Sequence, residues 1–285
     1  MYDSYFATAM RYGMDDYEAA IRPVKRQLFA ELASYLTRPA SAGSGSGTDG
    51  GSGSPPIRRV LEVGVGTGPN YAWYSEALSA AVAGTGAGTA TAATAEVAGP
   101  TTTAAAAATA GLPRLQVVGL DPSPAMLRFA EESARAAGMR LAGDAGGGGD
   151  GGDGIGGGLD VEASLIEGSA EALPFADGEF DAAVVTLVLC SVPSPAVALA
   201  ELRRVVRPAG RLLLIEHVAA PPARPLLRLA QSALTPLQRL MADGCCLNRD
   251  TGAAVRAAGW GGVLREFDLE GMSILAPHVA GLLVR

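Results

Sequence analysis

The sequence lacks the features that mark several classes of protein. Only 3 of its 285 residues are cysteines, and Cys245 and Cys246 are adjacent, so no disulfide framework is expected and a reducing compartment fits best. No segment reaches about 18 consecutive apolar residues, so no membrane span is predicted. The net charge is −7 and the 22 basic residues form no long run, which argues against a nucleic-acid surface. A small molecule is therefore the expected partner.

Two segments bear on where the protein resides. The first 30 residues place Asp3, Asp15, Asp16 and Glu18 among tyrosines, a pattern typical of neither a secretory signal nor a transit peptide. The segment 226–240 sets arginines among leucines, and such a helix can lie against a membrane surface. We favour a helix beside the substrate with its arginines in water. The expected location is thus cytoplasmic or organellar and soluble, with a membrane surface as the alternative, and no oligomeric state is predicted.

Three low-complexity blocks interrupt an otherwise regular pattern. Residues 40–56 are rich in Gly and Ser, residues 80–111 in Ala, Thr and Gly, and residues 143–160 in Gly and Asp. Each is interpreted as a flexible surface insertion. The Gly-Asp block lacks the nonapeptide period of calcium-binding repeats, so no calcium site is expected. We expect one domain over residues 1–285, with residues 1–39 forming a helical lid.

Outside these blocks, strand and helix patterns alternate, which is typical of a mostly parallel sheet covered by helices on both faces. Pro69 and Pro124 lie near expected helix starts, where a missing N–H costs little. The predicted fold class is α/β, with a seven-stranded sheet. The predicted strands are 57–63, 115–120, 163–167, 180–187, 211–217, 262–268 and 279–284, and the predicted helices after the lid are 70–80, 124–137, 196–206 and 250–258.

The most informative segment is an apolar strand that runs through Glu62 into three alternating glycines. Gly64, Gly66 and Gly68 permit a tight turn and a close approach of the backbone to a ligand, and the following helix presents free N–H groups. A dinucleotide fingerprint would need a glycine where this chain has Pro69. The spacing therefore favours a nucleotide-type cofactor other than a nicotinamide or flavin dinucleotide.

Asp121 is the candidate ribose ligand, because an acidic residue about 20 positions beyond the glycines commonly ends the second strand of such folds. It lies 53 residues beyond Gly68, or 21 residues when the 32 residues of the block 80–111 are left out. An alternative is that Asp121, which precedes a proline, only caps the next helix.

Four motifs then follow one another along the chain: Leu61-Glu62-Val63-Gly64-Val65-Gly66-Thr67-Gly68, Gly119-Leu120-Asp121, Gly168-Ser169-Ala170-Glu171-Ala172-Leu173-Pro174-Phe175 and Phe180-Asp181. Together they resemble the motifs of class I S-adenosylmethionine-dependent methyltransferases. The resemblance implies a Rossmann-like fold and S-adenosyl-L-methionine as the cofactor. Many relatives carry Asp where this chain has Ser169, so a backbone carbonyl or Glu171 is expected to receive the adenine amino group.

The resemblance also implies which residues bind the cofactor. Glu62 and the glycines line its methionine part, Asp121 takes the ribose hydroxyls, and Ser169 with Ala170 lies beside the adenine. The complete implied set is Glu62, Gly64, Val65, Gly66, Thr67, Gly68, Asn70, Asp121, Pro122, Met126, Ser169, Ala170, Glu171 and Thr186.

Further segments are more distinctive: Gly68-Pro69-Asn70-Tyr71-Ala72-Trp73-Tyr74, Thr186-Leu187-Val188-Leu189-Cys190-Ser191-Val192, Glu216-His217-Val218 and Asp243-Gly244-Cys245-Cys246-Leu247-Asn248-Arg249. They resemble the methyltransferase-like seven group, which includes alkyl-thiol S-methyltransferases, and its plant and algal relatives. The resemblance implies methylation of a small-molecule acceptor, with a thiol as first choice. Two alternatives stay open: methylation of a quinone or another lipophilic molecule on carbon or oxygen, and cofactor binding without turnover.

Methyl transfer from a sulfonium is an in-line displacement, so the protein chiefly supplies proximity and a dry site. His217 ends a predicted strand on the carboxyl side of the sheet and is predicted to act as a base or to position the acceptor; its alternative is a structural histidine. Cys190, on the same side, either lines the acceptor site or packs as a small hydrophobe. A soft-metal site of Cys190, Cys245 and Cys246 lacks Cys-x-x-Cys spacing, so no metal ligand is predicted.

Overall fold

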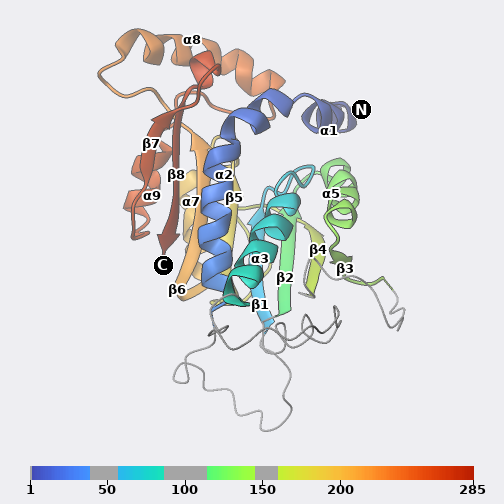
Figure 1. Cartoon of the computed structure of the whole chain (residues 1–285). Helices are drawn as coiled ribbons and strands as arrows, with labels where there is room; N and C mark the ends of the chain where they lie inside the picture. The colour runs from blue at the N-terminus through green and yellow to red at the C-terminus, as the bar shows by residue number, and fades with distance from the viewer. Residues whose placement is uncertain (1, 39–56, 87–113, 145–159) are drawn as a thin grey trace, which may run out of the picture.

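The computed structural model describes residues 2–38, 57–86, 114–144 and 160–285 (Figure 1). Three segments lie outside the described residues: the block 40–56, most of the block 80–111 and the Gly-Asp repeats. The prediction that these repeats bind no calcium therefore lies outside the described residues too. The helices are α1 Tyr2–Tyr12, α2 Asp15–Leu36, α3 Tyr71–Gly86, α5 Pro124–Ala136, α7 Pro195–Val205, α8 Pro225–Met241, α9 Thr251–Ala257 and the short 3-10 helix η1 Ser273–Leu275. The strands are β1 Ile57–Val63, β2 Arg114–Asp121, β3 Arg140–Leu141, β4 Val161–Glu167, β5 Phe180–Thr186, β6 Val206–His217, β7 Arg265–Asp268 and β8 Pro277–Val284.

The strands form one sheet in the order β3-β4-β2-β1-β5-β6-β8-β7. Neighbouring strands are parallel from β3 to β6, whereas β8 pairs antiparallel with both β6 and β7. The carboxyl ends of parallel strands meet at one edge of a sheet, which is where ligands bind in this architecture. The ends of β1, β2, β5 and β6 therefore bring Glu62, Asp121, Thr186 and His217 to a common edge. This mostly parallel α/β architecture confirms the predicted fold class.

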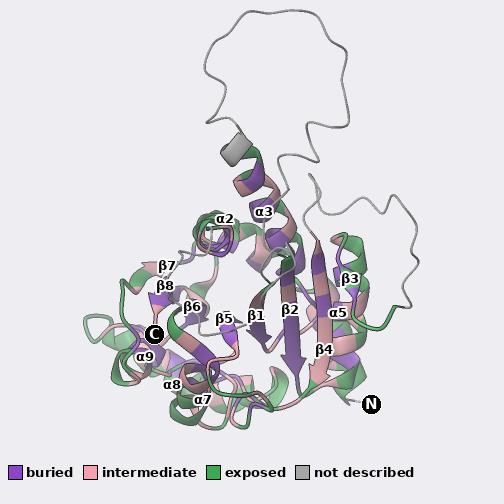
Figure 2. Ribbon diagram, turned by 90° about the horizontal axis from the view of Figure 1, so that it is seen from below, coloured by how far each residue is buried: buried purple, intermediate pink, exposed green. Residues whose placement is uncertain are grey.

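The carboxyl-terminal halves of the central strands β1 and β2, and most of β5, are buried because helices cover both faces of the sheet (Figure 2). Successive residues point to opposite faces. In β5, Val184 packs in the layer formed with α2, α3 and α5, and Val185 packs in the layer formed with α7 and α9. The two layers hold the carboxyl-end edge of the sheet in place.

Several strand and helix ends are shifted, the largest shift of a strand end being the start of β6 at Val206 and not at residue 211, and two further details differ from the sequence prediction. The sheet has eight strands rather than seven, because β3 adds a pairing of two residues at the edge, too short to show an alternating pattern. Helix α3 continues to Gly86, so residues 80–86 are helical and not a loop; its alanines are good helix formers. The expected helix starts at Pro124 and Asp250 are confirmed by caps, since Ser123 and Asp250 each accept a backbone N–H of the first turn.

Helix α8 lies beyond the carboxyl-end edge of the sheet, at the same end of the molecule as α1 (Figure 1). The prediction that its arginines face water is only partly right, because Arg228 donates to the carbonyl of Ala220. The leucines face water as well: Leu226 is 81% exposed and Leu229 is 67% exposed. The helix is attached instead through its polar side, where the buried Gln231 amide bonds backbone groups of Val218, Ala220 and Ile274.

Candidate active site

The glycine loop after β1 takes a conformation that suits glycine. Gly64, Gly66 and Gly68 all have positive φ, of 64°, 55° and 76°. A Cβ on Gly64 would lie 2.4 Å from Cγ2 of Val188, and a Cβ on Gly68 would lie 2.9 Å from the Tyr71 ring. The loop is therefore tightly packed at both ends, against the turn that follows β5 and against the start of α3.

The Asp121 carboxylate ties the glycine loop to the start of α5. Its Oδ2 accepts the N–H of Gly66 and its Oδ1 accepts the N–H of Ser123, both at 2.9 Å. Burial raises the pKa of Asp121, while these two donors lower it. The alternative that Asp121 serves as the helix cap is wrong, since the N-cap is Ser123, whose Oγ accepts the N–H of Met126. Asp121 thus lies beside the glycine loop, as a ribose-binding carboxylate must.

Glu62 is fully buried under the same loop. Its Oε1 accepts a hydrogen bond from Asn70 Nδ2 at 2.9 Å, and the same nitrogen lies 3.0 Å from Thr186 Oγ1. Burial raises the pKa of Glu62 to about 7, against the hydrogen bonds of Asn70 and Tyr74 and the charge of Lys25. The Oδ1 atom of Asn70 is buried and has no hydrogen-bond partner among the described residues. A carboxylate next to an unsatisfied amide oxygen suits a cationic group such as an ammonium.

The segment predicted to face adenine lies next to these groups. The N–H of Gly168 donates to the carbonyl of Asp121, which places Ser169 and Ala170 beside the end of β2. The Glu171 carboxylate accepts the N–H of Ser194 at 2.5 Å, so it joins the start of α7 instead of standing free in a turn. Of the remaining predicted residues, Thr67 and Val65 are buried in the loop, Met126 packs against α1, and Pro122 is exposed.

A second group of side chains surrounds His217 at the end of β6. His217 Nε2 lies 3.1 Å from Cys245 Sγ, and the sulfur of Cys190 belongs to the same cluster. The Cys190 thiol, and after it the His217 ring, lowers the pKa of Cys245, while the hydrogen bond to Cys245 and burial raise the pKa of Cys190. Cys190 lies in the turn after β5 and not in the strand, which ends at Thr186. Cys246 is buried nearby, but its sulfur points to the carbonyl of Gly244.

Two residues outside the set of predicted site residues hold the Cys190 turn in place. The buried Glu216 carboxylate accepts the N–H groups of Val188, Leu189 and Cys190. Arg249 donates to the carbonyls of Leu189 and Val192 from the other side. Both residues stand in the distinctive segments 216–218 and 243–249, but nothing in those segments indicated this structural role. Burial raises the pKa of Glu216 to about 7, against its three N–H donors.

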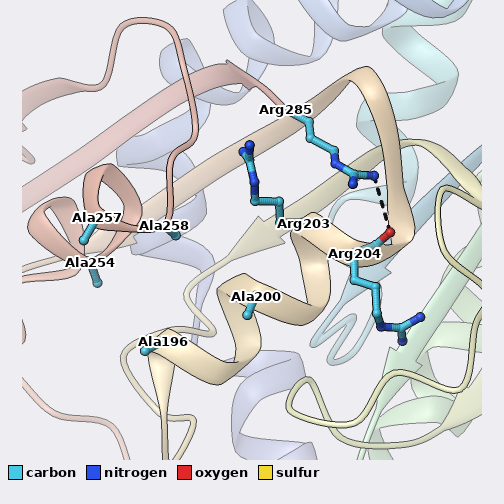
Figure 3. A pocket seen from close by; sticks show the side chains of 8 residues that line it. All are labelled: Ala196, Ala200, Arg203, Arg204, Ala254, Ala257, Ala258 and Arg285. Carbon is cyan, nitrogen blue, oxygen red and sulfur yellow. Dashed lines mark hydrogen bonds between the residues drawn. The ribbon is translucent and has the colours of Figure 1, made fainter.

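The N-terminal helix packs against the cofactor side of this edge. Its Asp3 carboxylate accepts a hydrogen bond from Ser123, and Arg11 donates to Ser133, whose hydroxyl in turn donates to the carbonyl of Thr67. The role of residues 1–39 as a lid stays a prediction. A hollow of about 590 Å³ lies elsewhere, between α7 and α9, and its lining of alanines and arginines contains none of the predicted site residues (Figure 3).

The parallel sheet, the glycine loop and an acidic residue at the end of β2 together define a class of protein. The model of the family described as "Methyltransferase domain" matches residues 83–214, a range that starts after the glycine loop. These features and the family match over residues 83–214 support the resemblance to class I S-adenosylmethionine-dependent methyltransferases.

Among individual proteins, the chain is 36% identical over 129 residues to the human thiol S-methyltransferase TMT1B, which covers 45% of this chain and 52% of that protein. It is also 43% identical over 87 residues to a demethylmenaquinone methyltransferase of Beutenbergia cavernae, covering 29% of this chain and 35% of that protein. The chain spans about half the length of the thiol methyltransferases it matches. A crystal structure of a SAM-dependent methyltransferase from Methanosarcina mazei is a more distant likeness, with a TM-score of 0.47, 17% identity, and coverage of 82% of this chain and 94% of that one.

Proposed function

We propose that this chain binds S-adenosylmethionine at the ends of β1 and β2 and transfers its methyl group to the sulfur of a small-molecule thiol. The observation that carries the cofactor half is the position of the Asp121 carboxylate, which bridges Gly66 and Ser123 at the mouth of the glycine loop. Each oxygen of the Asp121 carboxylate can accept a further hydrogen bond, and the ribose hydroxyls would supply it. Glu62 and the unsatisfied Asn70 oxygen would receive the methionine ammonium.

The acceptor half of the proposal rests on the end of β6. A methyl acceptor must lie in line with the sulfonium, and the turn 187–192 joins the two halves because Val188 packs on Gly64. His217 would then position the thiol or remove its proton, since a thiolate is the attacking form. The likeness to thiol S-methyltransferases supports the same choice of acceptor.

Methylation of a quinone is the second candidate, and the likeness to a demethylmenaquinone methyltransferase favours it. The two candidates differ in what the cluster at His217 must do. A thiol needs to be deprotonated and held as an anion, whereas a quinone ring needs a wide apolar surface. The buried sulfur and imidazole groups at the end of β6 suit a thiol better.

Calorimetry with S-adenosylmethionine tests the cofactor half. We expect Asp121→Ala to weaken binding by ~1–3 kcal/mol, the cost of lost hydrogen bonds to a charged group. Asp177→Ala is the matched control, because that side chain is 81% exposed in the turn before β5, and it should bind as the wild type does. Dissociation constants above the millimolar range in the wild type would contradict the proposal.

A panel of thiols, quinones and phenols with a labelled methyl donor tests the acceptor half. Methylation of thiols supports the proposal, methylation of quinones alone replaces it with the second candidate, and silence across the panel in a protein that binds the cofactor indicates binding without turnover.

We also propose that α8 lies on an anionic membrane surface. The helix and its N-cap carry Arg224, Arg228 and Arg239 and no acidic residue, in a chain whose net charge is −7; Arg224 forms an ion pair with Asp268. Exposed leucines beside arginines are the composition of an interfacial helix. In the described part of the chain, no helix is both long and apolar enough to cross a membrane.

A further inference from the structure

Three side chains from different parts of the chain converge at the end of β6. Cys190 follows β5, His217 ends β6, and Cys245 follows α8. One ligand atom from each lies within 4.8 Å of the other two. All three residues are buried, with exposures of 2%, 4% and 8%. Two thiols and an imidazole at this spacing form a donor set that the sequence, without a Cys-x-x-Cys motif, did not predict.

The geometry is close to that of a zinc site with three protein ligands. Around a tetrahedral zinc ion, Zn–S and Zn–N bonds of about 2.3 and 2.0 Å place the sulfur and nitrogen ligands ~3.5 Å apart and two sulfurs ~3.8 Å apart. His217 Nε2 and Cys245 Sγ are 3.1 Å apart, so the pair needs to open by only ~0.4 Å to admit the ion. Three ligands leave the fourth position open, which is the arrangement of catalytic zinc sites.

The surrounding contacts hold the three ligands in place. The N–H of Cys246 donates to the carbonyl of Cys190 at 2.9 Å, which joins the two cysteine-bearing segments directly. Glu216 fixes the Cys190 turn through three N–H groups, and the amide of Gln238 lies 3.8 Å from Cys245 Sγ. Such a supporting shell is what a preformed metal site requires.

The cluster also lies close to the predicted cofactor loop. Val188 packs directly on Gly64, and Cys190 is two residues further along the same turn. We propose that Cys190, His217 and Cys245 bind a zinc ion whose open position takes the acceptor thiol as a thiolate. This inference rests on the proposed function and assigns the activation of the acceptor to the metal, so that His217 positions the acceptor as a zinc ligand and does not act as the base.

The proposed step balances without a further reactant. The acceptor RSH binds zinc as RS⁻ and gives its proton to solvent. The sulfur then attacks the methyl carbon, a new C–S bond forms, and the bond from that carbon to the sulfonium breaks with its electron pair left on the cofactor sulfur. The products are the thioether RSCH₃ and S-adenosylhomocysteine. Zinc favours the anionic form of a coordinated thiol, so the acceptor need not be acidic.

Metal binding to the full-length chain tests the site independently of activity. We expect about one zinc ion per chain by elemental analysis, and cobalt titration of the metal-free protein should give the near-ultraviolet absorption of cobalt-thiolate bonds. Cys190→Ser and Cys245→Ser should each lose most of this absorption. Cys246→Ser is the matched control, because that residue adjoins Cys245 but its sulfur faces Gly244, and it should bind cobalt as the wild type does.

The outcomes separate the zinc site from the proposed function. No cobalt-thiolate absorption in the wild type, or equal absorption in Cys245→Ser, would overturn the site, and the wild-type titration needs no variant to fold. Thiol methylation at an undiminished rate by protein shown to be zinc-free would overturn the activation step and leave the thiol methyltransferase proposal standing. Zinc binding in a protein that methylates no thiol would overturn the proposed function and the activation step with it.

Discussion

Gly64 is the residue at which the cofactor loop contacts the turn 187–192. Substitution of Gly64 by alanine has two unfavourable effects on stability, a strained φ and a steric clash with Val188, and comparison with Gly66 separates them. An alanine at Gly64 meets both a left-handed φ and a Cβ contact of 2.4 Å with Val188, whereas an alanine at Gly66 meets the left-handed φ with no atom closer than 4.0 Å. We expect Gly66→Ala to lower the free energy of unfolding by ~1–2 kcal/mol. Gly64→Ala should lower it by roughly 1–3 kcal/mol more, because of overpacking.

Denaturant unfolding of the cofactor-free protein measures both values. Adding Val188→Ala to Gly64→Ala should recover the overpacking cost but not the cost of the positive φ. If the double variant is no more stable than Gly64→Ala alone, the contact with Val188 is not the source of the difference.

The raised pKa of Glu62 predicts that cofactor binding releases protons. With a pKa of about 7, this carboxyl group is largely protonated at pH 6 in the free protein. A bound ammonium group favours the ionised form, so binding at pH 6 should release up to one proton per cofactor. Calorimetry at pH 6 in two buffers of different ionisation enthalpy should give different heats for the wild type and equal heats for Glu62→Gln. Equal heats in the wild type would show that Glu62 does not ionise on binding.

At the scale of elements, α8 shows what an amphipathic pattern leaves open. The leucine spacing predicts a helix correctly, but the pattern identifies a polar and an apolar side without saying which side meets the protein. The Gln231 amide decides this, because three backbone groups bond to it and turn the leucines outward. The Gln231 amide bonds to three backbone groups that would otherwise need water as a partner. This contact depends on the tertiary structure, so the periodicity of the helix does not predict it.

The outward leucines predict binding of the protein to lipid vesicles. We expect the full chain to float with vesicles rich in phosphatidylserine and to bind phosphatidylcholine vesicles less well, because the arginines of α8 meet anionic head groups. Replacing Leu226, Leu229 and Leu237 by Ser should weaken binding at least roughly tenfold, since each removes apolar surface from the interface. Val263→Ser, at a residue that is 73% exposed away from α8, is the control and should bind normally. If the triple variant floats with vesicles as well as the wild type does, the leucine face of α8 is not the membrane-binding surface.

At the scale of the whole molecule, the sequence is sufficient for the sheet and for the cofactor loop but not for the acceptor side. The loop and Asp121 could be predicted because they follow strands at fixed spacing, once the block 80–111 is left out. The cluster at His217 joins residues 27 and 28 positions apart, from loops whose approach depends on Glu216 and Arg249. No local pattern encodes that approach, so His217 and Cys190 could be placed on the acceptor side from sequence, but their convergence with Cys245 could not be predicted.

The buried carboxyl group of Glu62 also predicts how the stability of the whole protein depends on pH. Glu62 has a pKa of about 7 in the folded state and an ordinary value of 4.5 in the unfolded chain. Because the pKa of Glu62 is higher in the folded state than in the unfolded chain, its contribution to stability is fully present at pH values below 4.5. This contribution is lost as the pH rises through 7. The difference corresponds to ~3 kcal/mol.

We expect the cofactor-free wild type to melt at a lower temperature at pH 8 than at pH 6, and Glu62→Gln to show a smaller decrease. Saturating S-adenosylmethionine should also reduce the decrease in the wild type, because the ligand pairs with the ionised carboxylate. A wild type and a Glu62→Gln variant with parallel melting curves across this range would show that Glu62 keeps its ordinary pKa in the fold.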